Sequence, residues 1–279
     1  MHTLNVLILK MVIKMRNKEQ LKTDIPKMLK RRGFKDIAYH FTSGRLPTVA
    51  FLGGLMSDMT GTKAMALETH CKKIGQAFIR FDYTGHGQSG GNFIDYTISD
   101  WQNDTLAIID RVIDGPIVLV GSSMGGWQML LAVKNRPTRI NGLIGVAVAP
   151  DFTEDLMWGK FPKSVQELIS KEGIINVPSH YEGKGYPITL KLIEDGRKNL
   201  LLRDKINFSG PVRLLHGMCD EDVPWQTTLK VVDHLSSMDV VTTFIKDGDH
   251  RLSNKMAIQK LRDNVDEICL LVQKAKNLV

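Results

Sequence analysis

Short runs of apolar residues alternate with longer amphipathic segments from about residue 34 to the end of the chain. Several short runs are apolar at every position, which is typical of parallel strands covered by helices on both faces. Strands are predicted at residues 37–41, 48–52, 77–82, 117–120, 143–149, 212–215 and 240–246, and helices at residues 62–74, 98–113, 127–135, 225–236 and 254–278. The alternation predicts an α/β fold with a mostly parallel central sheet.

The segment 151–208 interrupts this alternation. It has no run comparable to the strands elsewhere, and it carries Met157, Trp158, Phe161 and Tyr186 among charged residues. Because it follows one core strand and precedes the last two, it is predicted to be a small inserted cap, whose aromatic residues form either its own core or a substrate contact. The expected regions are a basic N-terminal extension (1–33), the first part of the core (34–150), the cap (151–208) and the second part of the core (209–279).

The composition is that of an ordinary globular chain. It has 279 residues, of which 43% are hydrophobic and 24% are charged, enough for a sizeable core. The three cysteines (Cys71, Cys219 and Cys269) are far apart, which indicates neither a disulfide framework nor a metal site. We therefore expect a reducing compartment, no metal and no disulfide bond.

The net charge of +7 comes largely from the first 35 residues, which contain ten Lys or Arg against Glu19 and Asp24. No aromatic residues alternate with these charges in the way that base stacking requires, so no nucleic-acid partner is expected. The apolar stretch 4–13 is interrupted by Lys10 and has no secretory cleavage pattern, so neither secretion nor stable membrane insertion is expected. The predicted compartment is the cytoplasm. A mitochondrial presequence is the alternative, because no acidic residue precedes Arg16.

The motif with the most chemical content is Gly-Ser-Ser-Met-Gly at residues 121–125. It has the G-x-S-x-G pattern, and it lies between an apolar strand and a helical segment, the setting in which a nucleophilic serine is held on a sharp turn. Small residues at Gly121 and Gly125 fit such a turn because neighbouring backbone must pass close to it. Ser123 is therefore the candidate nucleophile, and the Met124 N–H at the start of the helix is a candidate donor to a developing negative charge.

A serine hydroxyl needs a base within hydrogen-bond reach and an acid to orient that base. His250 lies in a polar turn directly after the last predicted strand, at the sheet edge where Ser123 also emerges, and it is the candidate base. Asp220 lies 30 residues earlier, after the preceding strand, in the pattern H-G-x-x-D-x-x-V-P, and it is the candidate acid. Asp222 and Asp151, both also after strand ends, remain alternatives.

Two glycine-containing loops complete the predicted site. Gly53 and Gly54 follow the strand 48–52, and we expect the Leu55 N–H to be the second donor of an oxyanion hole. The loop after strand 77–82 contains His86, which we interpret as a turn residue rather than a second base.

The segments FLGGLMSDMTGTKA, FIRFDYTGHGQSGG, DGPIVLVGSSMGGWQMLLA, LIGVAVA and RLLHGMCDEDVPW, together with Asp249-His250-Arg251, resemble the α/β-hydrolase superfamily. Within it they resemble the abhydrolase-domain thioesterases and acyl-glucuronide esterases and their bacterial relatives. The resemblance implies the α/β-hydrolase fold and ester or thioester hydrolysis, with Ser123, Asp220 and His250 in the catalytic positions. The cap matches only in scattered places, so the resemblance does not indicate a substrate.

The sequence thus predicts a serine esterase or thioesterase, of the class EC 3.1, that forms an acyl-enzyme on Ser123 and needs no cofactor. Its expected partner is a small-molecule or lipidated-protein acyl ester or thioester, and its oligomeric state is left open. A serine peptidase on the same fold and a non-catalytic binding module are the alternatives. A peptidase would be distinguished by comparing the turnover of amide and ester substrates. A binding module on this fold usually lacks a triad residue, whereas all three are present in this sequence.

Overall fold

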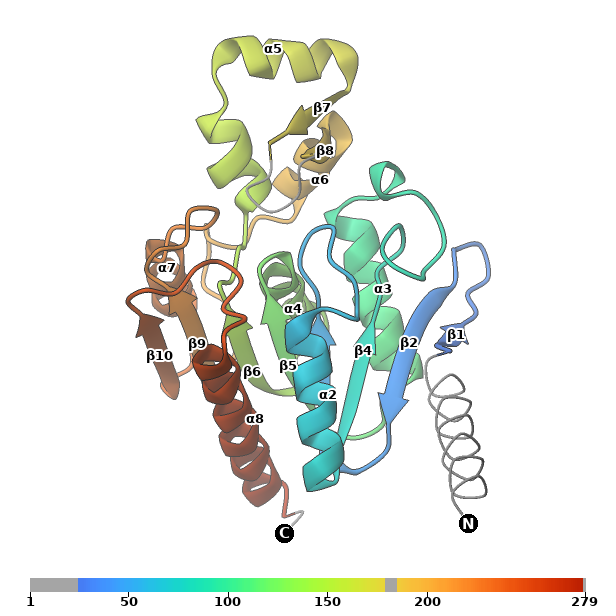
Figure 1. The fold of residues 1–279 in the computed structure, drawn as a ribbon, viewed down its shortest axis with the longest axis vertical. Coiled ribbons are helices and arrows are strands. Elements are labelled where there is room, and N and C mark those ends of the chain that lie inside the picture. Colours follow the sequence, from blue (N-terminus) through green and yellow to red (C-terminus); the bar gives the residue numbers. More distant parts are fainter. Residues whose placement is uncertain (1–24, 179–184, 278–279) are drawn as a thin grey trace, which may run out of the picture.

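A computed structural model describes residues 25–178 and 185–277 of the chain. A twisted sheet lies at the centre with helices on both faces, and a smaller unit stands above one edge of the sheet (Figure 1). The predicted fold class, a mostly parallel sheet covered on both sides with an inserted cap, is confirmed. The expectations for the leader at residues 4–13 and for most of the extension fall on residues 1–24, outside the described residues.

The sheet has eight strands in the order β1-β2-β4-β3-β5-β6-β9-β10. β2 is antiparallel to both β1 and β4, and the other pairs are parallel. Because the parallel strands run the same way, the loops that follow β3, β4, β5, β9 and β10 meet at one edge. The strands are β1 Lys27–Leu29, β2 Ile37–Thr42, β3 Arg45–Leu52, β4 Gln76–Phe81, β5 Ile117–Ser122, β6 Ile140–Val146, β9 Val212–Gly217 and β10 Val240–Ile245.

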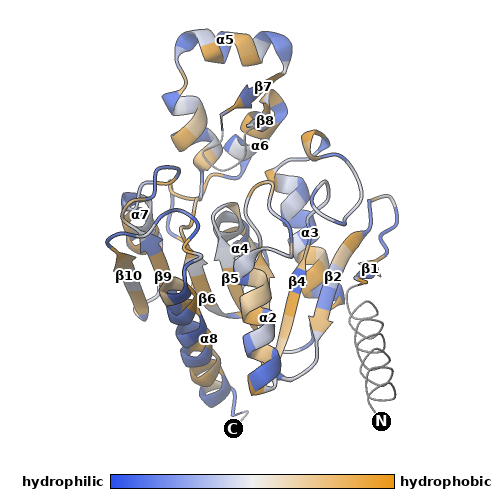
Figure 2. Cartoon of the chain, in the orientation of Figure 1, coloured by the Kyte–Doolittle hydropathy of each residue, from blue (hydrophilic) through white to orange (hydrophobic). Residues whose placement is uncertain are grey.

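Two hydrophobic clusters cover the two faces of this sheet. β3 shows why its run is apolar throughout: Val49 and Phe51 belong to the cluster that includes α2 and α8, whereas Ala50 and Leu52 belong to the cluster that includes α3, α4 and α7. Hydrophobic residues accordingly run along the strands, and polar residues mark the outer side of α8 (Figure 2). The helices are α2 Thr62–Ile74, α3 Ile98–Arg111, α4 Met124–Asn135, α7 Gln226–His234 and α8 Lys255–Ala275. No helix in the two described ranges is long and apolar enough to cross a bilayer.

The structure differs from the sequence prediction at a few ends. β1 lies inside the predicted extension 1–33 and pairs with β2, so the sheet begins before residue 34. β6 ends at Val146 rather than at residue 149, because Ala147 has a φ of 46° that breaks the extended backbone, although Val148 and Ala149 stay buried. The helix predicted from residue 127 begins earlier, at Met124. The predicted end of the last helix, residue 278, lies outside the described residues.

The segment 151–208 forms short helices and a small two-stranded antiparallel sheet. The sequence analysis found no strand of core quality here, and the two strands are indeed short and only partly buried. Figure 1 shows this unit above the carboxyl edge of the main sheet. Its elements are η2 Thr153–Met157, η3 Trp158–Lys160, α5 Lys163–Glu172, β7 Ile174–Val177, β8 Tyr186–Thr189 and α6 Leu190–Lys198.

One buried carboxylate joins the two ends of the cap. Asp151, at 0% exposure and with a φ of 58°, lies where the chain leaves the core. Its two oxygens accept the N–H groups of Leu201 and Leu202, each at 2.8 Å, where the chain returns. The outgoing and returning segments are therefore held together at the base of the cap.

Other polar contacts hold α6 of the cap to the core. The Asp195 carboxylate accepts the N–H and the hydroxyl of Ser99, at the start of α3, each at 2.8 Å. The Trp127 indole N–H in α4 donates to the Asn199 carbonyl oxygen at 3.0 Å. The base of the cap is thus fixed to the two helices that lie beside the turn at Ser123.

We predict that Asp151→Ala lowers the free energy of unfolding by about 3 kcal/mol, because two buried N–H groups lose their acceptor. Asp155→Ala is the matched control, since Asp155 is a partly exposed partner of Arg203 and its loss is expected to cost less than about 1 kcal/mol. Urea denaturation of both variants measures the difference. Equal losses of stability in the two variants contradict the role assigned to Asp151.

Candidate active site

The turn between β5 and α4 places Ser123 at the carboxyl edge of the sheet. Ser123 has φ 56° and ψ −120°, a strained conformation for a residue with a side chain. Gly121 and Gly125 make this turn possible. A methyl group at Gly121 would lie 2.5 Å from the Gly125 carbonyl oxygen, and one at Gly125 would lie 2.1 Å from the Leu52 carbonyl oxygen. The predicted need for small residues at both positions is therefore met by direct backbone contact.

Ser123 is connected to His250 and Asp220 by a continuous chain of hydrogen bonds. The Ser123 Oγ lies 3.0 Å from the His250 Nε2, and the His250 Nδ1 lies 2.8 Å from the Asp220 Oδ2. A carboxylate can only accept, so Nδ1 carries the proton and Nε2 is free to accept the serine proton. The structure brings together the three residues that the sequence analysis selected from separate loops.

Asp220 is held by more than His250. Its Oδ1 accepts the N–H groups of Asp222 at 3.0 Å and Val223 at 2.8 Å. Its Oδ2 also faces the Nε2 of His216 at 3.0 Å. Burial by itself would raise the pKa of Asp220, but the hydrogen bonds from His216 and His250 outweigh it and hold the pKa well below its usual range. The carboxylate is thus kept ionised behind the imidazole.

His216 was not selected as a site residue by sequence reasoning. It lies in β9 at 0% exposure, with its Nδ1 2.6 Å from the Thr228 Oγ1. The Thr228 hydroxyl can donate to Nδ1, which leaves the Nε2–H directed at Asp220 and at the Val223 carbonyl oxygen, also at 3.0 Å. The available signal was its place at the end of a strand, four residues before Asp220, on the same side as the acid.

The two alternative acids have other surroundings. Asp151 is occupied at the base of the cap, as described above. The Asp222 carboxylate lies near the site, within 4.8 Å of ligand atoms of Asp220 and His250, and among the described residues these three side chains form the one group able to hold a metal ion. Because His250 already faces Ser123 with one nitrogen and Asp220 with the other, a metal there would displace one of these hydrogen bonds.

The loop after β3 lies against the serine. A methyl group at Gly54 would lie 3.4 Å from the Ser123 Cβ and 3.9 Å from its Oγ, so Gly54 lies beside the Ser123 side chain. The Met124 N–H belongs to the first residue of α4 and has no acceptor within the helix. The two predicted donors therefore come from two segments: Met124 directly follows Ser123 in the chain, and Leu55 follows Gly54 in the loop after β3.

His86 is neither exposed nor next to Ser123 in the hydrogen-bond network. It is 4% exposed in the loop after β4, and its Nε2 accepts the Met56 N–H at 3.1 Å. The interpretation of His86 as a turn residue omitted this link to the loop that carries Leu55.

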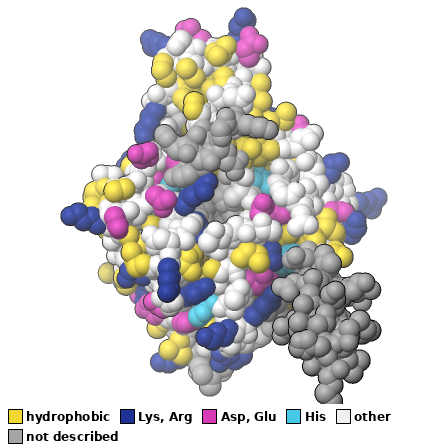
Figure 3. Space-filling view, in the orientation of Figure 1, with side chains coloured by type: hydrophobic (Ala, Val, Ile, Leu, Met, Phe, Trp, Pro, Cys, Tyr) yellow, Lys and Arg dark blue, Asp and Glu magenta, His cyan; other side chains and the backbone are white. Residues whose placement is uncertain are grey.

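The face of the molecule drawn in Figure 3 has hydrophobic side chains gathered on the cap, whereas Lys and Arg are scattered among acidic residues. Met157, Trp158, Ile175 and Tyr186 of the cap pack against the same hydrophobic cluster that contains Met124. The cap is thus joined to the core by hydrophobic contacts as well as by the polar contacts at its base.

Comparisons with known proteins agree with this architecture. Residues 59–178 match the family model described as the alpha/beta hydrolase fold. The chain is 42% identical to the mitochondrial palmitoyl-protein thioesterase ABHD10 of Mus musculus over 241 residues. This match covers 86% of this chain and 81% of the mouse protein. The solved structure of mouse ABHD10 superposes with a TM-score of 0.82 at 41% identity, over 87% of this chain and 97% of that one. A solved structure from Agrobacterium vitis S4 gives a TM-score of 0.83 at 38% identity, over 88% and 97% of the two chains.

These likenesses cover nearly the whole described core, and they confirm the resemblance inferred from the motifs. The chain belongs to the α/β-hydrolase fold family, in the group that contains ABHD10.

Proposed function

We propose that the protein is a serine hydrolase that cleaves thioester or carboxylic ester bonds through an acyl-enzyme on Ser123. The observation that carries the proposal is the continuous contact from the Asp220 carboxylate through His250 to the Ser123 hydroxyl. The name of the mouse relative, a palmitoyl-protein thioesterase, supports a thioester as the bond cleaved. A non-catalytic binding module would have no need of this contact.

In the proposed reaction the Ser123 Oγ attacks the carbonyl carbon of the substrate while the His250 Nε2 takes the hydroxyl proton. The tetrahedral intermediate then collapses, and His250 returns the proton to the departing thiolate or alkoxide. Water repeats the two steps: it gives its proton to His250, attacks the acyl carbonyl, and releases the carboxylic acid as Ser123 is reprotonated.

Asp220 keeps His250 in the tautomer that accepts the serine proton, and it stabilises the imidazolium that forms in each step. The Met124 and Leu55 N–H groups are the proposed donors to the carbonyl oxygen when it becomes negative. Their support is the start of α4 at Met124 and the contact of the Gly54 backbone with Ser123. The hydroxyl, the imidazole, the carboxylate and two peptide dipoles suffice for acyl transfer.

An apolar acyl group is supported by the name of the mouse relative, a palmitoyl-protein thioesterase. The cap residues Met157, Trp158, Ile175 and Tyr186 are partly buried and pack against the main hydrophobic cluster of the core. An acyl chain bound between the cap and the core would be shielded from water. The proposed substrate is therefore an acyl thioester or ester of a small molecule or a lipidated protein.

The proposed compartment is the mitochondrion, and the support for it comes from the names of the relatives. The ABHD10 proteins of mouse and human are named as mitochondrial, which supports the mitochondrial alternative over the cytoplasmic expectation.

We predict that Ser123→Ala lowers kcat on an acyl thioester by about 10⁴-fold to 10⁶-fold, because no other oxygen replaces the nucleophile. Ser122→Ala, which changes the neighbouring serine of the same motif, is expected to keep kcat within about threefold. The assay uses thioesters, oxyesters and amides of two to sixteen carbons, together with fluorophosphonate labelling and mapping of the labelled peptide.

Full activity in Ser123→Ala, or labelling at a different residue, contradicts the proposal. Faster turnover of amides than of esters supports the peptidase instead. The absence of turnover and of labelling in the native protein supports the binding module.

The adjacent acids allow a second test. Asp220→Asn is expected to lower kcat by about 10³-fold to 10⁴-fold, because an amide at this position no longer selects the Nδ1–H tautomer of His250. Asp222→Asn preserves its backbone N–H to Asp220 and is expected to retain most activity. Steady-state kinetics of both variants, with circular dichroism to verify folding, decide between them. A larger loss in Asp222→Asn reverses the assignment of the acid.

A further inference from the structure

Two loops at the carboxyl edge of the sheet meet behind the proposed oxyanion hole. The loop after β3 carries Gly54 against Ser123, followed by Leu55, and the loop after β4 carries His86. One contact between the loops is the hydrogen bond from the Met56 N–H to the His86 Nε2, at 3.1 Å. It joins the residue next to Leu55 to a side chain that does not itself touch Ser123 in the hydrogen-bond network.

This hydrogen bond acts on an unusual piece of backbone. Met56 has a φ of 54°, in the left-handed region that side-chain-bearing residues seldom adopt. The peptide between Leu55 and Met56 is planar, so holding its N–H fixes the direction of the whole plane. The rotation of Leu55 on the other side of that plane is then restricted, and with it the direction of the Leu55 N–H. A second contact, from the Ser57 N–H to the Gly54 carbonyl oxygen at 3.2 Å, closes the turn.

The environment of His86 holds the ring in the form that can accept this bond. Its Nδ1 faces the Thr84 carbonyl oxygen at 3.3 Å, so the proton belongs on Nδ1 and the lone pair on Nε2. The rings of Tyr83, Phe93 and Trp101 surround it, with centroids between 5.2 and 5.7 Å away. Burial among them lowers the pKa of His86 to about 4, so the ring stays neutral at physiological pH.

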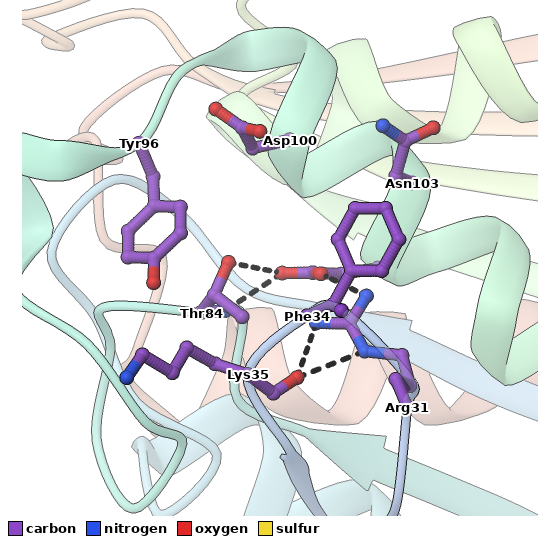
Figure 4. A pocket seen from close by; sticks show the side chains of 9 residues that line it. Arg31, Phe34, Lys35, Thr84, Tyr96, Asp100 and Asn103 are labelled. Atoms are coloured by element: carbon purple, nitrogen blue, oxygen red, sulfur yellow. Dashed lines mark hydrogen bonds and ion pairs between the residues drawn. The ribbon is translucent and has the colours of Figure 1, made fainter.

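The backbone that presents His86 is fixed from outside. The Thr84 N–H and hydroxyl both donate to the Asp104 Oδ2, at 2.7 and 2.8 Å, and Asp104 forms a buried ion pair with Arg31 at 2.7 Å. Thr84, Arg31 and Asp104 line a cavity of about 370 Å³, and Figure 4 shows Thr84 and Arg31 there together with Lys35. The far end of the β3 loop is fixed as well, because the Asp82 carboxylate accepts the Met59 N–H at 2.6 Å.

We propose that His86 is a positioning residue of the oxyanion hole: by accepting the Met56 N–H, it aims the Leu55 N–H at the oxygen that becomes negative when Ser123 attacks. This inference rests on the proposed function, since it assigns a role within the same reaction. His86 exchanges no proton with the substrate. It keeps the Leu55 N–H dipole oriented before the charge develops, so this dipole need not reorient when the oxygen becomes negative.

The test compares two substitutions of nearly equal length. His86→Gln retains a side-chain oxygen that can accept the Met56 N–H, whereas His86→Met fills similar space with a much weaker acceptor. His70→Gln, at a histidine of α2 that pairs with Asp266, is the control for losing a histidine elsewhere. Each variant is measured for kcat and KM on one acyl thioester, for inhibition by an alkyl boronic acid that mimics the tetrahedral intermediate, and for thermal unfolding.

In His86→Met we expect kcat to fall about 10-fold to 100-fold with KM changed less than about threefold, since the bond is used in the transition state. Boronic acid affinity should fall by a similar factor. His86→Gln should recover a large part of both losses, and His70→Gln should match the wild type.

Wild-type kcat and boronic acid affinity in His86→Met overturn the inference. Equal losses of kcat and boronic acid affinity in His86→Gln and His86→Met, together with the same drop in unfolding temperature, also overturn it. The ring would then contribute only packing. Failure of the proposed function is separate: it appears as activity retained in Ser123→Ala, whatever the His86 variants do.

Discussion

The site depends on the close passage of backbone around the turn at Ser123. The Gly125 Cα lies so near the Leu52 carbonyl oxygen that no side chain fits there, and this contact locks α4 against the end of β3. Ser123 lies between this contact and the end of β5 with a φ of 56°, its hydroxyl faces His250, and α4 begins at the next residue, Met124. Strain of this kind costs on the order of 1–3 kcal/mol per residue and persists only where the surrounding structure fixes it. The two hydrophobic clusters on the faces of the sheet supply that fixation.

Three histidines at the sheet edge share one physical principle. In each ring one nitrogen faces an acceptor that settles where the proton lies: Asp220 for His250, the Val223 carbonyl for His216 and the Thr84 carbonyl for His86. The second nitrogen is thereby given a definite role as donor or acceptor. For the two buried rings, exclusion of water removes competing partners, so each hydrogen bond has few alternatives. The hydrogen-bond network around Ser123 is therefore oriented by neutral groups as well as by the charged Asp220 carboxylate.

The sequence predicted the fold class and the residues that meet at Ser123, because those signals are local. A G-x-S-x-G turn between a strand and a helix, and polar residues directly after strands, can be read without knowing how the chain folds. The roles of His216, His86 and Asp151 depend on partners 4, 30 and 50 residues away, and no periodicity records such pairings. β1 was missed because three residues with a partly polar pattern carry no strand signal, and its stability comes from pairing with β2. The cap strands are equally short and half exposed.

The Asp151 carboxylate joins the two ends of the cap, so the insertion forms a closed loop that leaves and re-enters the core at one place. Whatever sequence lies between residue 151 and residues 201–202, its ends are brought to the same point, so β6 and β9 remain neighbours in register. Changes of length or composition within the loop need not propagate into the framework below. The junction at Asp151 therefore separates the cap from the loops that carry Ser123, Asp220 and His250, which makes it a boundary at which one cap can be exchanged for another.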